Sequence, residues 1–124
     1  MARIAQWTLD VHDTARMASF WSAALGYRAD YGDDGCAKLY PPEDAPEFAL
    51  TVWLQRVDAP KRDKNRNHPD LRPADGSTVE DEVARLIALG ARPADVGQRD
   101  DDPFVVLADP EGNEFCVLRN PVRR

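Results

Sequence analysis

The residues of this chain best suited to chemistry stand at the starts of two similar stretches. Gln6 begins the stretch Gln6–Asp10, and His68, one of only two histidines, begins His68–Arg72. Sixty-two positions separate them, which is half of the 124 residues. An imidazole can act as a base or a metal ligand, and it can also be a hydrogen-bonded structural residue. Because of the repeat, a pocket role and a structural role are equally open for His68.

The segments that must position these residues also occur twice. Each half has an alternating stretch, then an aspartate, then a helix-like segment that ends in Ala-Leu-Gly, at 24–26 and 88–90. A half-chain repeat of this kind predicts two stacked modules with a cleft between them. We predict an α+β fold of two tandem βαβββ modules whose strands form a curved mixed sheet around a central cleft. Module one covers about residues 1–57, the linker about 58–66 and module two about 67–124, all in a single domain.

Hydrophobic periodicity and end signals place the elements within each half. The first helix is expected to begin at Asp13 or Thr14 and to end at Gly26. The second is expected to begin in a capping box formed by Ser77 and Glu80, and to end at Gly90. Its predicted buried stripe consists of Val79, Val83, Leu86 and Ile87. Strands are expected at about 3–11, 27–31, 36–40, 48–57, 68–72, 104–108 and 113–118.

Strand alternation predicts a polar sheet face opposite the helices. The apolar side chains Leu9 and Phe115 should lie beneath the helices, so their polar neighbours should face the other way. A strand face this polar must be solvated or line a pocket. The candidate ligand-binding residues on this face are Gln6, Thr8, Asp10, Trp53, Gln55, Asp70, Arg72 and Cys116.

Several of these candidates have a second interpretation. Asp10 and Arg72 occupy equivalent places in the two halves and could pair with each other instead of contacting a ligand. Trp53 and Tyr40 could stack on a planar ligand, or belong to the core or to an interface. Cys116 is more typical of a small buried packing residue than of a nucleophile, because nothing in the sequence indicates a lowered thiol pKa.

Composition excludes some classes of partner. A formal net charge of −6 argues against nucleic acid. The one basic stretch, Lys61–Arg66, is interpreted as a solvated loop between the modules rather than an anion site. No apolar run reaches membrane-spanning length and no signal-peptide core precedes the first strand, so we expect a cytoplasmic protein without a membrane partner. Cys36 and Cys116 are expected to be free thiols.

Three stretches of the sequence are similar to those of a known superfamily. Phe20–Tyr27 and Asp109–Phe115, together with the doubled βαβββ plan, resemble the vicinal oxygen chelate superfamily, which includes glyoxalase I, bleomycin-resistance proteins and extradiol dioxygenases. Lys64–Leu71, with the ending Asn113–Leu118, is similar to the small bacterial glyoxalase-like domains of that superfamily. The resemblance spans nearly the whole chain. It is specific for the fold and weak for the reaction.

The resemblance also implies where a metal ion would bind. Enzymes of this superfamily usually hold one divalent metal on ligands from the first and last strands of each module, and Gln6 and His68 match the two first-strand ligands. The last-strand positions, where metal enzymes carry glutamate, fall on Cys116 and on Gln55 or Trp53. Such a set lacks the usual carboxylate, so we expect the protein to bind no metal at this site; the alternative is a divalent ion, Zn, Ni, Fe or Mn.

Three functional classes stay open. We favour a small-molecule-binding protein of the bleomycin-resistance kind, without a complete metal site. The alternative is a metal-dependent lyase or isomerase, with His68 as ligand or base, Gln6 as ligand or polariser, and Glu114 as acid or base. A regulatory or partner-binding module is the third. The resemblance also implies a homodimer, which would cover the exposed sheet edges.

Overall fold

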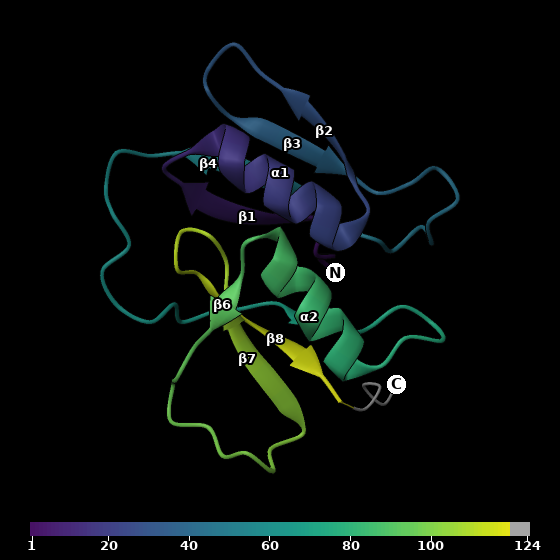
Figure 1. Ribbon diagram of the computed structural model, residues 1–124. Helices are drawn as coiled ribbons and strands as arrows, with labels where there is room; N and C mark the ends of the chain where they lie inside the picture. Colours follow the sequence, from purple (N-terminus) through teal and green to yellow (C-terminus); the bar gives the residue numbers. More distant parts are fainter. Residues whose placement is uncertain (120–124) are drawn as a thin grey trace. The chain divides into compact units, whose positions relative to one another are not determined.

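The computed structural model describes residues 1–119, shown in Figure 1. The chain divides into two compact units, Met1–Pro60 and Lys61–Arg124, called here the first and second unit. Residues 120–124 of the predicted second module lie outside the described part. Within that part, neither helix is long and apolar enough to cross a membrane.

The first unit has the order βαβββ. Its elements are β1 (Gln6–Val11), α1 (Thr14–Leu25), β2 (Arg28–Tyr31), β3 (Ala37–Tyr40) and β4 (Thr51–Arg56). The strands form a mixed sheet in the order β1-β4-β3-β2, in which only the β1–β4 pair is parallel. In Figure 1, α1 lies across one face of this sheet. Its residues Met17 and Trp21 are fully buried, as are Leu39 and Leu54 on the strands.

The second unit repeats this order. Its elements are β5 (Asp70–Leu71), α2 (Val79–Leu89), β6 (Arg92–Pro93), β7 (Phe104–Ala108) and β8 (Glu114–Leu118). The sheet order is β5-β8-β7-β6, and the β5–β8 pair is parallel. Leu86 of α2, with Leu107 and Phe115 of the sheet, is fully buried. The predicted α+β class and the tandem βαβββ plan are therefore confirmed, with one four-stranded mixed sheet in each unit. The cleft between the units stays a prediction.

The ends of the first helix confirm the sequence prediction. The carboxylate of Asp13 accepts a hydrogen bond of 3.1 Å from the backbone N–H of Arg16, which would otherwise have no partner in the first turn. Gly26 follows the last turn with φ 70° and ψ 32°. This left-handed conformation strains residues that carry a Cβ, so glycine is the residue suited to end α1 there.

The start of the second helix differs from the prediction by one residue. The expected capping box of Ser77 and Glu80 is wrong, because the cap is Thr78. Its hydroxyl accepts a hydrogen bond of 3.1 Å from the backbone N–H of Asp81. Thr78 has extended backbone angles (φ −98°, ψ 160°) and helical geometry starts at Val79. The threonine is therefore the residue whose hydroxyl meets the unpaired N–H groups.

The buried face of α2 is narrower than the predicted stripe. Leu86 is fully buried, whereas Val79 and Val83 are half-buried and Ile87 is 41% exposed. The buried face of the helix is centred on Glu82 and Leu86. Ile87 is rotated by about 100° from Leu86 around the helix axis, so its predicted burial is wrong.

The strand that follows His68 is shorter than predicted. Only Asp70 and Leu71 pair with β8, so His68 and Arg72 lie outside the ladder. Prolines stand at positions 69 and 73. Proline has no N–H to donate, so each of them limits the ladder at one end.

Candidate functional site

Five side chains predicted to bind a ligand share one face of the first sheet. They are Gln6, Thr8, Asp10, Trp53 and Gln55. Thr8 lies opposite Trp53 in the parallel ladder, and the intervening pair of Leu9 and Leu54 is buried on the other side. Successive side chains of a strand point to opposite faces, so this polar face is turned away from α1. The predicted strand parity is confirmed for the first unit.

The two glutamines of this face already take part in hydrogen bonds within the sheet. Oε1 of Gln6 accepts a bond of 3.0 Å from the Thr51 hydroxyl. Oε1 of Gln55 accepts a bond of 2.8 Å from the Trp53 indole N–H, and its amide nitrogen lies 3.4 Å from Sγ of Cys36. Both amide groups are thus oriented by their neighbours before any ligand binds.

A cavity of about 420 Å³ opens beside Trp53 on the first unit. We call it the aromatic hollow. It is lined by Asp30, Tyr31, Gly32, Asp33, Asp34, Lys38, Tyr40 and Trp53. The sequence singled out Trp53 and Tyr40, but it missed Tyr31 and the carboxylates. The acidic turn between the two short strands was the signal that could have found them.

Acidic side chains outnumber basic ones in the lining of the aromatic hollow, where Asp30, Asp33 and Asp34 stand against Lys38. The Arg28 guanidinium lies 4.8 Å from the centroid of the Tyr40 ring, and Nζ of Lys38 lies 5.4 Å from it. Arg28 also forms an exposed ion pair of 2.6 Å with Asp30. A ring face attracts cations through its quadrupole, and nearby carboxylates add to that attraction. The arrangement can therefore hold a flat molecule that carries a positive group.

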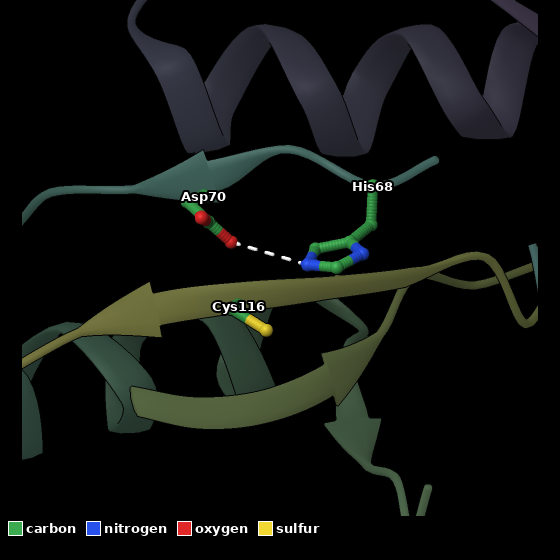
Figure 2. A group of neighbouring side chains, drawn as sticks. All are labelled: His68, Asp70 and Cys116. Atoms are coloured by element: carbon green, nitrogen blue, oxygen red, sulfur yellow. Dashed lines mark ion pairs between the residues drawn. The ribbon is translucent and has the colours of Figure 1, made fainter. Parts of the chain in front are cut away.

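The second unit brings together His68, Asp70 and Cys116, called here the His–Asp–Cys cluster (Figure 2). Nε2 of His68 lies 3.3 Å from Oδ1 of Asp70, and one candidate ligand atom from each residue lies within 4.8 Å of the others. The convergence follows from topology. Asp70 and Cys116 are partners in the parallel β5–β8 ladder, and His68 stands two residues before Asp70, on the same side.

Cys116 is buried, with 6% of its surface exposed. Burial raises the pKa of its thiol to about 11, and the charge and hydrogen bonding of Asp70 act in the same direction, against a smaller opposing effect of Lys64. At neutral pH the group is therefore a neutral thiol, which agrees with the packing role inferred from the sequence.

The cluster fits a zinc-like ion chemically. An imidazole, a carboxylate and a sulfur are the ligand types that zinc binds in proteins, and three of them leave one coordination position open. His68, Asp70 and Cys116 would hold the ion. Asp70 supplies a carboxylate, and it is not among the metal-ligand positions that the superfamily resemblance implied. The predicted metal pair of Gln6 and His68 draws on both units and stays a prediction.

Glu114, proposed as an acid or base, is engaged in a buried polar network. Its Oε1 accepts a hydrogen bond of 2.8 Å from Nζ of Lys61, and both carboxylate oxygens lie 3.3 Å from the backbone N of Asn65. Burial tends to raise the pKa of Glu114, but these hydrogen bonds and the Lys61 charge together lower it below its usual value. These contacts favour a structural role for Glu114, in which its carboxylate holds residues 61–65 on β8, over a role as an acid or base.

The remaining candidates are exposed. Thr8 and Asp10 lie on β1, and Arg72 directly follows β5. Their exposure leaves them accessible to a ligand. The alternative pairing of Asp10 with Arg72 stays a prediction.

Comparison with known proteins is informative about the fold. Residues 6–118 match the model of a family described as a glyoxalase-like domain. No curated protein matches the chain. Among solved structures, the chain is similar to the genomically encoded fosfomycin resistance protein FosX from Listeria monocytogenes, with 14% identity, a TM-score of 0.72, and coverage of 98% of this chain and 96% of that one.

Two further structures give the same result. A glyoxalase-related enzyme from Fulvimarina pelagi is 17% identical, with a TM-score of 0.70 over 98% of this chain and 91% of that one. A glyoxalase/bleomycin resistance protein from Albidiferax ferrireducens T118 is 19% identical, with a TM-score of 0.64 over 95% of this chain and 98% of that one. At such identities the likeness shows the fold alone.

Proposed function

We propose that this chain, which belongs to the glyoxalase-like domain family of the vicinal oxygen chelate superfamily, binds a small organic molecule. The family match confirms the resemblance inferred from the sequence. The aromatic hollow is the observation that carries the proposal, because a cavity of about 420 Å³ is within the range of small-ligand sites. Its rings and carboxylates indicate a planar ligand with a positive group.

The chemistry of the hollow supports that ligand class. Trp53 and Tyr40 are half-buried, so each ring is held in place and still has exposed surface. Tyr31 is 61% exposed and adds a third ring to the lining. Lys38 already lies near the Tyr40 ring, so a cationic group of a ligand would be attracted instead to the carboxylates of Asp33 and Asp34.

A planar monocation, 9-aminoacridine, is a suitable probe for isothermal titration calorimetry. Replacing Trp53 with alanine removes a stacking surface, so we expect affinity to fall roughly tenfold or more. The Phe48→Ala variant is the matched control, since Phe48 is an exposed ring of the same unit outside the hollow. Absence of binding by the unaltered protein, or equal affinity of Trp53→Ala, would contradict the proposal.

A second candidate function is a divalent-metal-dependent lyase or isomerase, favoured by the His–Asp–Cys cluster. A bound metal would supply Lewis-acid polarisation of a substrate oxygen. His68 and Asp70 would orient and hold it, and Cys116 would lose its proton on binding. Because the pKa of that thiol is raised to about 11, metal affinity should increase as the pH rises.

Metal analysis of protein purified without chelator separates the two candidates. We expect one equivalent of Zn, Ni, Fe or Mn if the cluster is a metal site, retained in His12→Ala and lost in His68→Ala and Cys116→Ala. His12 is the only other histidine and lies in the first unit, so it controls for nonspecific imidazole binding. Protein that carries no metal and takes up no added Zn would exclude this candidate.

A further inference from the structure

The basic segment 61–66, which follows β4 and precedes β5 in the sequence, is attached to the second unit. Most of its residues are exposed, as expected for the predicted solvated loop, and the segment is also anchored. Lys61 donates a hydrogen bond to the buried Glu114, and the backbone N–H of Asn65 donates to the same carboxylate. The side-chain amide nitrogen (Nδ2) of Asn65 also donates a hydrogen bond of 3.0 Å to Oδ1 of Asn113. Asn113 is held in turn by the buried carboxylate of Asp109. Residues 61–65 are thereby held against β8 and the turn that precedes it.

This anchoring helps to form a cavity of about 410 Å³ on the second unit, called here the basic hollow. Its lining includes Lys61, Arg62 and Lys64 from the anchored segment and Arg92 from β6. Among residues 1–119, Arg62, Lys64 and Arg92 form no ion pair. Three cations without a carboxylate partner thus border one cavity in a chain whose net charge is −6.

The floor of the basic hollow requires a glycine. Gly112 has φ +88°, and a Cβ added there would lie 3.4 Å from Nη2 of Arg92 and 3.9 Å from Cδ of Lys61. The Arg92 guanidinium and the Lys61 stem therefore both lie over this turn. Two cationic side chains that are distant in the sequence thus approach the same turn, and the positive φ of Gly112 is what favours glycine there.

The basic hollow lies on the same face of the second sheet as the His–Asp–Cys cluster. Glu114 lines the hollow and stands two positions before Cys116 on β8, so both side chains point to one face. Arg92 is the partner of Ala108, which is itself the partner of Glu114. The charge of Lys64 also acts on the Cys116 thiol. A ligand that occupies the basic hollow would thus have its other end directed along the face that carries His68.

We propose that the basic hollow binds the anionic group of a small organic molecule, a phosphate monoester or a carboxylate, through Arg62, Lys64 and Arg92. The guanidinium groups can each give two parallel hydrogen bonds to such an oxyanion, and Lys64 adds a point charge. Three carboxylates, Asp63, Asp95 and Glu114, also border the cavity, and their charge weakens the attraction for an anion. Glu114 is already neutralised by Lys61. The site does not depend on the aromatic hollow or on a metal.

The test is a titration with inorganic phosphate and, separately, with acetate, at constant ionic strength and monitored by backbone amide NMR. We expect millimolar phosphate to shift the amides of Gly112 and of residues 62–64 in a saturable manner. Arg92→Gln and Lys64→Gln should each weaken binding at least fivefold. Arg99→Gln removes an exposed cation of the same unit outside the hollow and should leave affinity unchanged.

The two anions distinguish the two possible ligands. Tighter binding of phosphate indicates a phosphate monoester, and comparable or tighter binding of acetate indicates a carboxylate. The proposal is overturned if neither anion causes saturable shifts, if chloride causes the same shifts, or if Arg92→Gln and Lys64→Gln bind as the unaltered protein does. Both variants replace exposed side chains, so folding is not at risk and loss of binding can be assigned to the site.

Discussion

Replacing Lys61 with methionine should destabilise the protein far more than loss of a surface lysine. The Lys61 side chain is 23% exposed and its partner, Glu114, is 10% exposed. Removing one member of a buried ion pair leaves an uncompensated charge, which costs about 3 to 5 kcal/mol. Some of Lys61 reaches solvent, and the backbone N–H of Asn65 still donates to the carboxylate. We therefore expect a loss of about 2 to 3 kcal/mol in the free energy of unfolding at neutral pH.

The cost should depend on pH in a defined direction. In the unaltered protein the pKa of Glu114 is below its usual value. Its stabilising effect is therefore present above the unfolded-state pKa and is lost as pH falls through the folded-state pKa. Without Lys61, its hydrogen bond and its charge no longer lower the pKa of Glu114, so that pKa should be higher than in the unaltered protein. Protonation then removes the buried charge, and the penalty of Lys61→Met should shrink as the solution is acidified from neutral pH.

Urea unfolding monitored by circular dichroism at a series of pH values measures both effects. A Lys61→Met, Glu114→Gln double variant keeps an acceptor for the backbone N–H of Asn65 but has no buried charge. It should recover much of the stability lost in Lys61→Met, and its own penalty should not depend on pH. Arg99→Met, which breaks an exposed ion pair with Asp101, should cost less than about 1 kcal/mol. A Lys61→Met penalty as small as that of Arg99→Met, or one that stays constant with pH, would refute this reasoning.

Two further predictions concern the cysteine thiol and the helix of the second unit. Because the pKa of Cys116 is raised to about 11, only about one part in a thousand is thiolate at pH 8, so alkylation located by mass spectrometry should be slow in the native protein. Asp70→Asn should accelerate it by removing a charge that raises this pKa, and an unchanged rate would contradict that assignment. Leu86→Ala should lower the free energy of unfolding by about 3 kcal/mol and Ile87→Ala by less than about 1 kcal/mol. Equal losses in urea unfolding would show that the helix packs differently.

The sequence was sufficient for features that depend on neighbouring residues. The Asp13 cap and the left-handed Gly26 follow from patterns within a few positions, and the tandem βαβββ plan follows from the recurrence of such local patterns in each half; all are confirmed. Strand parity placed Trp53 on the face opposite α1 for the same reason, since alternation is a property of a single strand. Errors of one residue, as at Thr78, arose where two adjacent residues could both serve as a cap.

The candidate sites depended on contacts between distant parts of the chain, and only the tertiary structure decided these. Glu114 binds Lys61 across 53 positions, and this contact places the predicted solvated loop along one side of the basic hollow. Asp70 meets Cys116 only because β5 pairs with β8 in one particular register. Composition and periodicity describe each strand separately, whereas the register is set by how the whole sheet and its helix pack. For that reason the sequence could single out residues whose types suit chemistry, such as His68 and Cys116, and the fold determined which of them lie together.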